Sequence, residues 1–442
     1  MFAMIGMMPN TVMADIPLDR LREINRISEI MTTKWSNLAI HKEKDGVNVQ
    51  KIIDGLKKRA GGSDEDYFVA LYETAGLFRD SHVNIFWPKD GILKKYTSGL
   101  RVARVREGYA VIQCTPPTNC GNLPLPTSVI EVDGKPIDDW IRQRATVLGG
   151  STKLGRQSRA MINLGWYTAI RQNPPAQSVT LLLPNSVIKT VNLNWEKYVW
   201  WDKEAGEPEP HCIKGERHPS GTFILTVEAF DCGLPGDRSW KNGYRRFVRN
   251  LKGALKNARN ADSIIVDVRE NGGGKPWIAK TIMQLLIDKE TLYETEFPFD
   301  EKRETYGEPK ERTAFPKKKW RKYFQGFPSA ILSGIECGSA CAYFVLAVKT
   351  ASTAMVLGEP AEGSNGSPKY YELSVSGAIL TVPSDQWPWG RSLGADGQPM
   401  ERRLINVDKK ILPSINDYRN AKDPILEEAI RDFRKEWSLR TK

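Results

Sequence analysis

The N-terminal part of the chain alternates between apolar and polar positions with the spacing of α-helices. Apolar side chains recur every three or four residues in residues 18–31 and 49–60, and the pattern returns after an acidic start in residues 64–78. This spacing places the apolar side chains on one face of each helix. We therefore predict a helical segment over residues 15–92.

Residues 97–197 change to short β-like runs that are separated by glycines and prolines. The sequence VDGKP at residues 132–136 predicts a tight turn between a strand and a short helix. The β-like runs lie at residues 99–114, 127–132, 178–184 and 187–195. These features predict a compact β-rich module with one or two helices.

Strand-like and helix-like segments alternate from about residue 220 onward. The strand-like segments are apolar throughout, which is typical of strands buried on both faces. Strands are predicted at residues 221–230, 262–268, 329–334 and 354–358, and helices at 240–258, 276–288, 339–351 and 423–437. The alternation predicts a parallel α/β core, and we assign it residues 198–440.

Composition limits the class of protein. The 442 residues predict two or three domains, and 40% hydrophobic with 26% charged residues is typical of a soluble globular chain. No apolar run approaches the ~20 residues that span a bilayer, so we expect no stable membrane insertion. The net charge is +11, but the basic residues are scattered, and we expect no nucleic-acid binding. The densest basic cluster, residues 316–322, is interpreted first as a solvated loop and second as a site for an acidic partner.

Six cysteines fall into three close pairs. Without CxxC spacing and with only four histidines in the chain, they do not predict a metal site. An even number of cysteines in close pairs suits disulfides in an oxidising compartment, although buried thiols are the alternative. By proximity the pairs are Cys114 with Cys120, Cys212 with Cys232, and Cys337 with Cys341.

The first residues bear on localisation. Residues 1–14 are mostly apolar, and Val12 and Ala14 are small enough for the −3 and −1 positions of a signal cleavage site, but a positive n-region is missing. The stretch is either the tail of a signal peptide that starts upstream or a frayed end. Together with the cysteines it favours a periplasmic or secreted protein.

A glycine-rich turn follows one of the predicted buried strands. Gly272, Gly273 and Gly274 come directly after the strand at residues 262–268. A phosphate cradle would need the GxGxxG or Walker spacing, which this turn lacks. An oxyanion hole needs only one or two free amides beside a nucleophile. A plain tight turn is the third interpretation.

Ser339 follows the next strand of the same predicted sheet. It stands at the start of an apolar helix, so it and the glycines lie at the same edge of the sheet. The helix dipole there favours negative charge on an attacking oxygen, although serine is also a frequent N-cap. A serine nucleophile needs a base.

The four histidines are not equivalent. His211 and His218 lie in a polar linker, and His41 lies among charged residues. His82 lies between the end of a predicted helix and an apolar β-like run, a junction at which a rigid scaffold can present a catalytic side chain. The alternative for His82 is a capping residue.

Five motifs in order resemble a known family. They are DSH at residues 80–82, IIVDVRENGGG at 264–274, CGSACAYFVLA at 337–347, AMVLGEPAEG at 354–363 and DPILEEAI at 423–430. The set resembles the tail-specific, or C-terminal-processing, serine peptidases, and among them the tricorn-core and retinoid-binding-protein-like branch. The resemblance implies a ClpP/crotonase-like parallel βαβ core and a PDZ-like module that holds a peptide end by strand addition.

The resemblance also implies roles for individual residues. Ser339 falls at the position of the family nucleophile. One branch of the family uses a lysine base, but its position here is Ser364, and Lys369 is out of register. The tricorn-like branch uses a serine–histidine pair with a distant glutamate. Ser81 and His82 match that pair, and Glu401 stands where the glutamate is expected, without the usual glycine and valine after it.

A mechanism follows from these roles. His82 takes the proton of Ser339 and Glu401 holds the other imidazole nitrogen, directly or through Ser81. Amides of Gly272 or Gly273 and of Ala340 hold the oxyanion. No metal or organic cofactor is required.

The resemblance thus predicts a serine endopeptidase that cleaves unstructured proteins or peptides and recognises chain ends, with a polypeptide as its partner. A carrier of an apolar ligand, or a peptide-binding pseudoenzyme on the same fold, is the alternative.

Overall fold

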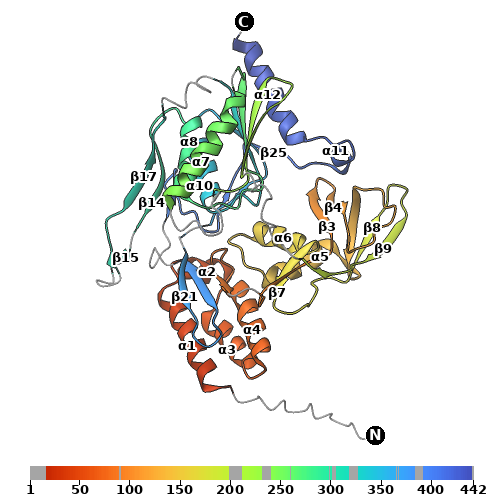
Figure 1. The fold of residues 1–442 in the computed structure, drawn as a ribbon, viewed down its shortest axis with the longest axis vertical. Coiled ribbons are helices and arrows are strands. Elements are labelled where there is room, and N and C mark those ends of the chain that lie inside the picture. The colour runs from red at the N-terminus through yellow and green to blue at the C-terminus, as the bar shows by residue number, and fades with distance from the viewer. Residues whose placement is uncertain are drawn as a thin grey trace.

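The computed structural model describes most of the chain. The described residues are 16–88, 91–198, 212–230, 240–258, 260–297, 299–300, 305–317, 327–364, 366, 368–383 and 392–440. The N-terminal helices, the β-rich module and the α/β core occupy separate parts of the molecule (Figure 1). Among the described helices, none has both the length and the apolar character to span a membrane.

The described part of the N-terminal segment contains four helices, of which three were predicted. A capping box starts the fourth, because the Ser63 hydroxyl accepts from the Asp66 amide and the Asp66 carboxylate accepts from the Ser63 amide. Trp35 and Phe78 are fully buried in the apolar core of the segment. The helices are α1 (Leu18–Thr33), α2 (Leu38–Asp45), α3 (Val49–Arg59) and α4 (Asp64–Leu77). The short helix α2 was not predicted.

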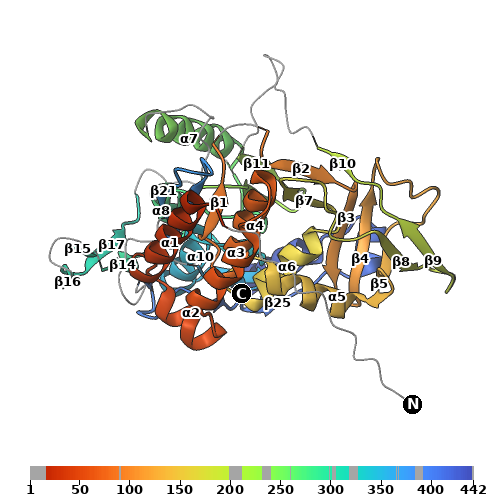
Figure 2. The ribbon, with the colours of Figure 1, turned by 90° about the horizontal axis from the view of Figure 1, so that it is seen from below.

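The module that follows is built on an antiparallel sheet with strand order β3-β4-β5-β8-β9 and a further strand β6 on β5. Burial along β3 follows the strand period, with Leu100 and Val102 directed into the module's core. A second sheet, β10-β2-β7, lies beside it (Figure 2). The elements are β2 (Lys94–Thr97), β3 (Leu100–Val105), β4 (Gly108–Cys114), β5 (Thr127–Val132), β6 (Lys135–Pro136), α5 (Ile137–Arg144), η1 (Ala145–Val147), α6 (Lys153–Ile162), β7 (Trp166–Ala169), β8 (Ser178–Leu182), β9 (Ile188–Asn192) and β10 (Glu196–Lys197).

The core is the predicted alternation of strands and helices. Its sheet has the order β11-β12-β13-β18-β19-β25, in which only β11 runs antiparallel to its neighbour among the described strands. Alternate side chains of β13 face opposite layers. Ile264 and Val266 pack with the helices α7, α8 and α10, whereas Ile265 packs with α12.

The bounds of the core elements are as follows. The strands are β11 (Ile213–Arg217), β12 (Thr222–Val227), β13 (Ser263–Asp267), β18 (Ser329–Ser333), β19 (Met355–Gly358) and β25 (Lys409–Lys410), and the helices are α7 (Trp240–Ala254), η2 (Leu255–Ala258), α8 (Pro276–Leu286), α10 (Ala340–Ala351), α11 (Ile415–Arg419) and α12 (Pro424–Arg440). Smaller sheets are formed by β14 (Thr291–Glu296), β15 (Phe299–Asp300), β16 (Thr305–Tyr306), β17 (Lys310–Ala314), β20 (Ala361–Glu362), β23 (Leu393–Gly394) and β24 (Leu404–Ile405).

A hairpin from the C-terminal half joins the core to the N-terminal helices. Strands β21 (Pro368–Glu372) and β22 (Ile379–Pro383) form a sheet with β1 (Asn84–Phe86), which starts two residues after His82. The Thr381 hydroxyl donates to the carbonyl of His82 over 2.9 Å. In Figure 1 this hairpin, drawn in blue, lies among the red helices of the N-terminal segment. The pairing fixes the backbone of His82 to the half of the chain that carries Ser339.

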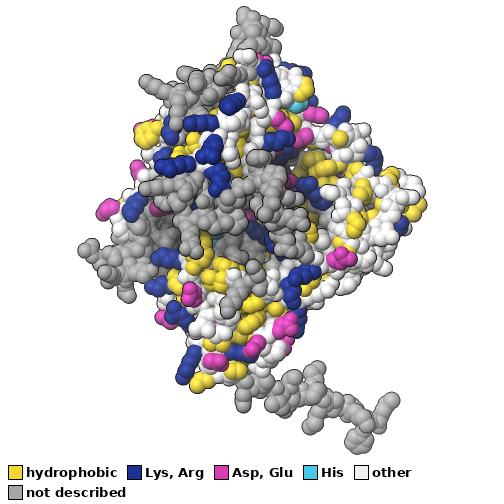
Figure 3. All heavy atoms as spheres, viewed as in Figure 1, with side chains coloured by type: hydrophobic (Ala, Val, Ile, Leu, Met, Phe, Trp, Pro, Cys, Tyr) yellow, Lys and Arg dark blue, Asp and Glu magenta, His cyan; other side chains and the backbone are white. Residues whose placement is uncertain are grey.

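Basic side chains lie on all three parts of the molecule and are not gathered into one patch on the face shown in Figure 3. The basic cluster at residues 316–322 falls largely outside the described residues, as do the signal-like residues 1–14 and His211.

Candidate active site

Ser339 is the last residue of the loop that connects strand β18 to helix α10. It is the residue before the helix and has φ 51° and ψ −126°, a conformation that is rare outside glycine. Holding such a residue costs on the order of 1–3 kcal/mol, which the surrounding structure must offset. The disulfide between Cys337 and Cys341 closes across Ser339, with the two Cα atoms 5.2 Å apart. It therefore ties the loop before Ser339 to the first turn of α10.

The other cysteines agree with the predicted pairing as far as the described residues go. Cys114 and Cys120 form a disulfide with a Cα–Cα distance of 6.4 Å. Cys212 is disulfide-bonded. Cys232 lies outside the described residues, so the pairing of Cys212 with Cys232 stays a prediction.

His82 reaches Ser339 from a part of the chain 257 residues away. Its Nε2 lies 3.3 Å from the Oγ of Ser339. The amide of His82 donates to Asp80 Oδ1 over 2.8 Å, which holds the turn between α4 and β1. The imidazole is only 15% exposed. The two residues that the sequence singled out therefore lie in hydrogen-bond reach of each other.

Glu401 is linked to His82 through two hydroxyl groups. Its carboxylate is hydrogen-bonded to Ser151, whose Oγ lies 3.0 Å from the Oγ of Ser81. Ser81 Oγ in turn lies 3.5 Å from His82 Nδ1, a long contact by hydrogen-bond standards. The sequence predicted a direct contact or one through Ser81 alone. Ser151 was missed because it lies in the module, far from any of the quoted motifs.

Asp80 is a second carboxylate beside the same imidazole. Its Oδ1 lies 4.0 Å from His82 Nδ1. Its Oδ2 accepts from Trp35 Nε1 over 2.8 Å and from Asn37 Nδ2 over 2.9 Å. The carboxylate is fully buried, and its position directly before Ser81 and His82 was the signal that could have identified it.

His41, which the sequence placed only among charged residues and did not assign to the site, is buried against these carboxylates. Its Nε2 lies 3.0 Å from Glu401 Oε1, and its Nδ1 lies 2.9 Å from Asp45 Oδ2. Asp80 Oδ2 lies 3.8 Å from the same Nε2. Burial by itself lowers the pKa of His41, but the hydrogen bonds to Asp45 and Glu401 outweigh it and raise the pKa to about 9.

With its pKa raised to about 9, His41 carries a proton at neutral pH and faces the Glu401 carboxylate. Burial raises the pKa of Glu401 and the charge of Asp80 adds to that rise, whereas the bonds from His41 and Ser151 oppose it. Three of these groups, His41, Asp80 and Glu401, offer ligand atoms within 4.8 Å of one another. Each is engaged in the hydrogen bonds described above, which a metal ion would have to displace, and we assign no ion to them.

The glycine turn packs against Ser339. A Cβ on Gly273, which has φ +102°, would lie 2.9 Å from the Cβ of Ser339, so that only glycine fits. Its amide donates to Asn271 Oδ1 over 2.8 Å, and the Asn271 side chain also donates to the carbonyl of Val227. Asn271, which the sequence did not single out, thus shapes the turn. Within the described structure, the amides of Gly272 and Ala340 have no hydrogen-bond partner.

Ser364 occupies the position of the lysine in the other branch. Its hydroxyl accepts from the amide of Ser339 over 3.0 Å. Lys369 lies on β21, where it is paired with Val382 of β22. The residue at the lysine position therefore supports the backbone of Ser339 and does not offer a base.

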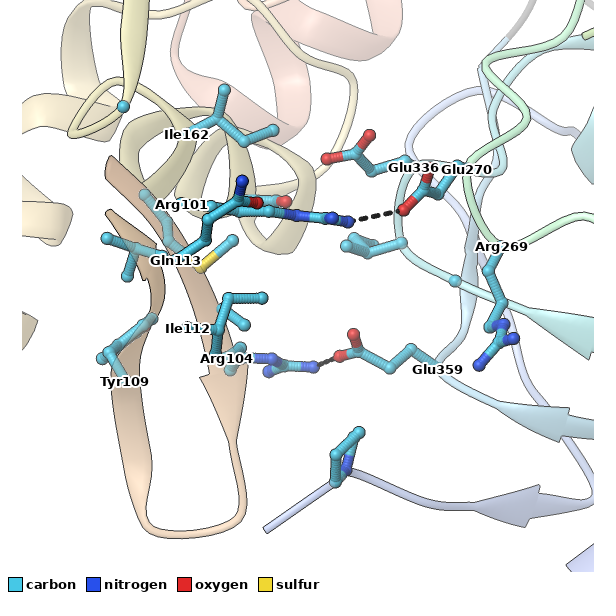
Figure 4. A pocket seen from close by; sticks show the side chains of 18 of the residues that line it. Arg101, Arg104, Tyr109, Ile112, Gln113, Ile162, Arg269, Glu270, Glu336 and Glu359 are labelled. Carbon is cyan, nitrogen blue, oxygen red and sulfur yellow. Dashed lines mark hydrogen bonds and ion pairs between the residues drawn. The ribbon is translucent and has the colours of Figure 1, made fainter. Parts of the chain in front are cut away.

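Three hollows adjoin the site. Ser339 and His82 line one of about 100 Å³. A cleft of about 810 Å³ is lined by Ser81, Gly272 and residues of α4 and α6. Another of about 810 Å³ separates β3 and α6 from the edge of the core (Figure 4).

Comparison with known proteins identifies the class of the core. Residues 224–395 match the model of peptidase family S41. The match includes the glycine turn and Ser339 but not His82 or Glu401. The chain therefore contains a serine-type peptidase domain of family S41, which confirms the resemblance seen in the sequence.

Over most of its length the chain is similar in fold to solved structures of CPAF. Mature CPAF complexed with lactacystin is 11% identical with a TM-score of 0.72, and the match covers 95% of this chain and 98% of that chain. Mature CPAF alone is 11% identical with a TM-score of 0.71, covering 94% and 96%. The photosystem II D1 C-terminal processing protease is 13% identical with a TM-score of 0.44, covering 94% and 97%. A search of curated proteins finds no match.

The raised pKa of His41 predicts a pH-dependent contribution to stability. Because the folded state holds the proton up to about pH 9 and the unfolded state only to about 6.5, the contribution is complete below about 6.5 and is lost as the pH rises through about 9. It amounts to about 3 kcal/mol. The Tm of the wild type should fall over this range by more than that of His41→Gln. His218→Gln is the matched control and should follow the wild type, whereas an equal fall in all three would contradict the prediction.

Proposed function

We propose that the protein is a serine endopeptidase in which Ser339 is the nucleophile and His82 the base. The observation that supports this most is the 3.3 Å distance between His82 Nε2 and Ser339 Oγ inside an S41 peptidase domain. His82 takes the hydroxyl proton as Ser339 attacks a peptide carbonyl, and then delivers it to the leaving amine. Water releases the acyl group in the reverse sequence.

The proposed oxyanion site consists of the amides of Gly272 and Ala340. Ala340 follows Ser339 in the chain, and Gly272 precedes Gly273, which packs against Ser339. Both amides lack other partners in the described structure, whereas the amide of Gly273 is engaged by Asn271. The start of α10 adds its dipole at the same place. Negative charge on the former carbonyl oxygen would be stabilised there.

The imidazole has two candidates for its orienting partner. Glu401 acts through Ser151 and Ser81, while Asp80 lies 4.0 Å from Nδ1. In the proposed mechanism both carboxylates stabilise the imidazolium that forms when His82 takes the proton. Neither needs to accept the proton itself.

We further propose that residues 97–197 form a PDZ-like module that recognises chain ends, beside a ClpP/crotonase-like core. Among the described strands, β3 pairs only with β4, so its other edge is open for an added peptide strand. The groove between β3 and α6 faces the core. The ion pairs Arg101–Glu270 and Arg104–Glu359 cross it (Figure 4). A polypeptide bound there would run along the edge of the core that carries the site.

Export to the periplasm or outside the cell is part of the proposal. Disulfides persist in oxidising compartments, and Cys337 and Cys341 are bonded beside the nucleophile. The N-terminal residues on which the signal-peptide hypothesis rests lie outside the described part. The alternative of a non-catalytic carrier predicts an unreactive Ser339.

The central test is substitution of the two residues. Ser339→Ala should abolish hydrolysis of an unfolded protein and labelling by a fluorophosphonate. His82→Ala should lower kcat by ~10³–10⁶, as expected when a member of a catalytic triad is removed. Lys369→Ala, the control for the lysine branch, should stay within about twofold of wild type, since no role is assigned to it. An inactive lysine variant beside an active histidine variant would overturn the assignment.

The groove is tested by filling it. Gln157 of α6 lines the groove. Gln157→Trp should raise KM for a long unfolded protein by roughly tenfold, equivalent to about 1.4 kcal/mol. The KM for a short peptide should stay unchanged. Gln143→Trp places the same side chain on the exposed surface of α5 and should change neither value. Equal losses on both substrates in Gln157→Trp would show that the module acts on the site itself.

A further inference from the structure

The small pocket beside Ser339 has an apolar wall and an acidic end. Its volume is about 100 Å³, roughly three times the share of one water in the liquid, which suits one unbranched side chain. Ala279 and Met283 of α8 and Phe344 of α10 supply the apolar wall. Helices α8 and α10 and strand β14 lie side by side around it (Figure 1). Glu294 and Glu296 of β14 line the same pocket.

An irregularity in β14 directs Glu294 inward. The register against β17 shifts between Leu292 and Glu294, as in a β-bulge. As a result Tyr293, Glu294 and Thr295 are all buried, where a regular strand would alternate. Bulges of this kind often aim a side chain at a site.

Among the described residues, Glu294 and Glu296 share one arginine. Glu294 Oε1 accepts from Ser392 Oγ over 3.0 Å. Arg312 of β17 lies 3.4 Å from Glu294 Oε2, but its Nη2 is directed to Glu296 over 2.6 Å. The two carboxylates thus face one described guanidinium. Tyr343 of α10 is buried beside them and adds no positive charge.

We propose that this pocket receives a basic side chain, lysine or arginine, from the substrate residue next to the scissile bond. The aliphatic stem would pack along Met283 and Phe344, and the cationic end would meet Glu294. Because Ser339 and His82 line the same pocket, a side chain held there would bring its backbone to the nucleophile. This inference rests on the proposed function, because it names the substrate class of that site.

The environment of Glu294 makes the preference dependent on pH. Burial raises the pKa of Glu294 to about 7, and repulsion from Glu296 adds to the rise, against the opposing effects of Arg312 and Ser392. A bound cation favours the ionised carboxylate, so it binds more tightly once Glu294 has lost its proton. Selectivity for a basic side chain should therefore rise between about pH 6 and about pH 8.

The experiment compares two peptides that differ at one residue, lysine in one and norleucine, which has the same four-carbon side chain without the ammonium group, in the other. We expect a higher kcat/KM for the lysine peptide, with a lysine-to-norleucine ratio that rises from about pH 6 to about pH 8. The ratio cancels groups that act on both peptides, including His82. Glu294→Gln should lower the ratio roughly tenfold and remove its pH dependence. Glu311→Gln, an exposed residue on β17, is the control and should leave the ratio unchanged.

Two failures can be told apart. If Ser339 is not labelled by a fluorophosphonate and neither peptide is cleaved, the proposed function is wrong, and the inference falls with it. If Ser339 is labelled and both peptides are cleaved, but norleucine is preferred or Glu294→Gln keeps the wild-type ratio, only the specificity is wrong. Cleavage sites mapped on an unfolded protein should cluster beside lysine and arginine.

Discussion

Two buried carboxylates that face one buried imidazole determine how the site is held. Asp80 and Glu401 come from opposite ends of the chain, and His41 lies between them with its Nε2 3.0 Å from Glu401 and 3.8 Å from Asp80. Uncompensated, each carboxylate would cost several kcal/mol on burial. The proton on His41 and the Trp35 and Asn37 donors offset that cost. Because Asp80 also binds the amide of His82, the cluster fixes the position of the proposed base.

The site is divided between parts of the chain that are distant in sequence. The matched S41 domain supplies Ser339, its helix and the glycine turn, and its own β21–β22 hairpin pairs with β1 behind His82. The base comes from the N-terminal segment, and Ser151 from the module that also forms the groove in Figure 4. Ser151 and Ser81 therefore connect the module to the proposed base by side-chain contacts.

Many of the helices and strands could be predicted because the local spacing of apolar residues indicates them. The helices at residues 18–31 and 64–78 and the alternating strands and helices after residue 220 follow from apolar spacing. Ser339 and His82 stood out because each follows an element end. His41 did not, since α2 is short and polar and its partner Glu401 lies 360 residues away. Ser151 and Asn271 are small polar residues whose roles exist only once distant segments meet.

The central claim is that the buried carboxylates position His82 for proton transfer from Ser339. It is tested most directly by the rate at which a fluorophosphonate labels Ser339 in Asp80→Asn, Glu401→Gln and the double variant. Each single variant should label at least roughly tenfold more slowly than wild type. The loss of labelling rate in the double variant should be smaller than the product of the two single losses, because both carboxylates act on the same imidazole of His82. Wild-type labelling rates in all three variants, with His82→Ala still slow, would contradict the account.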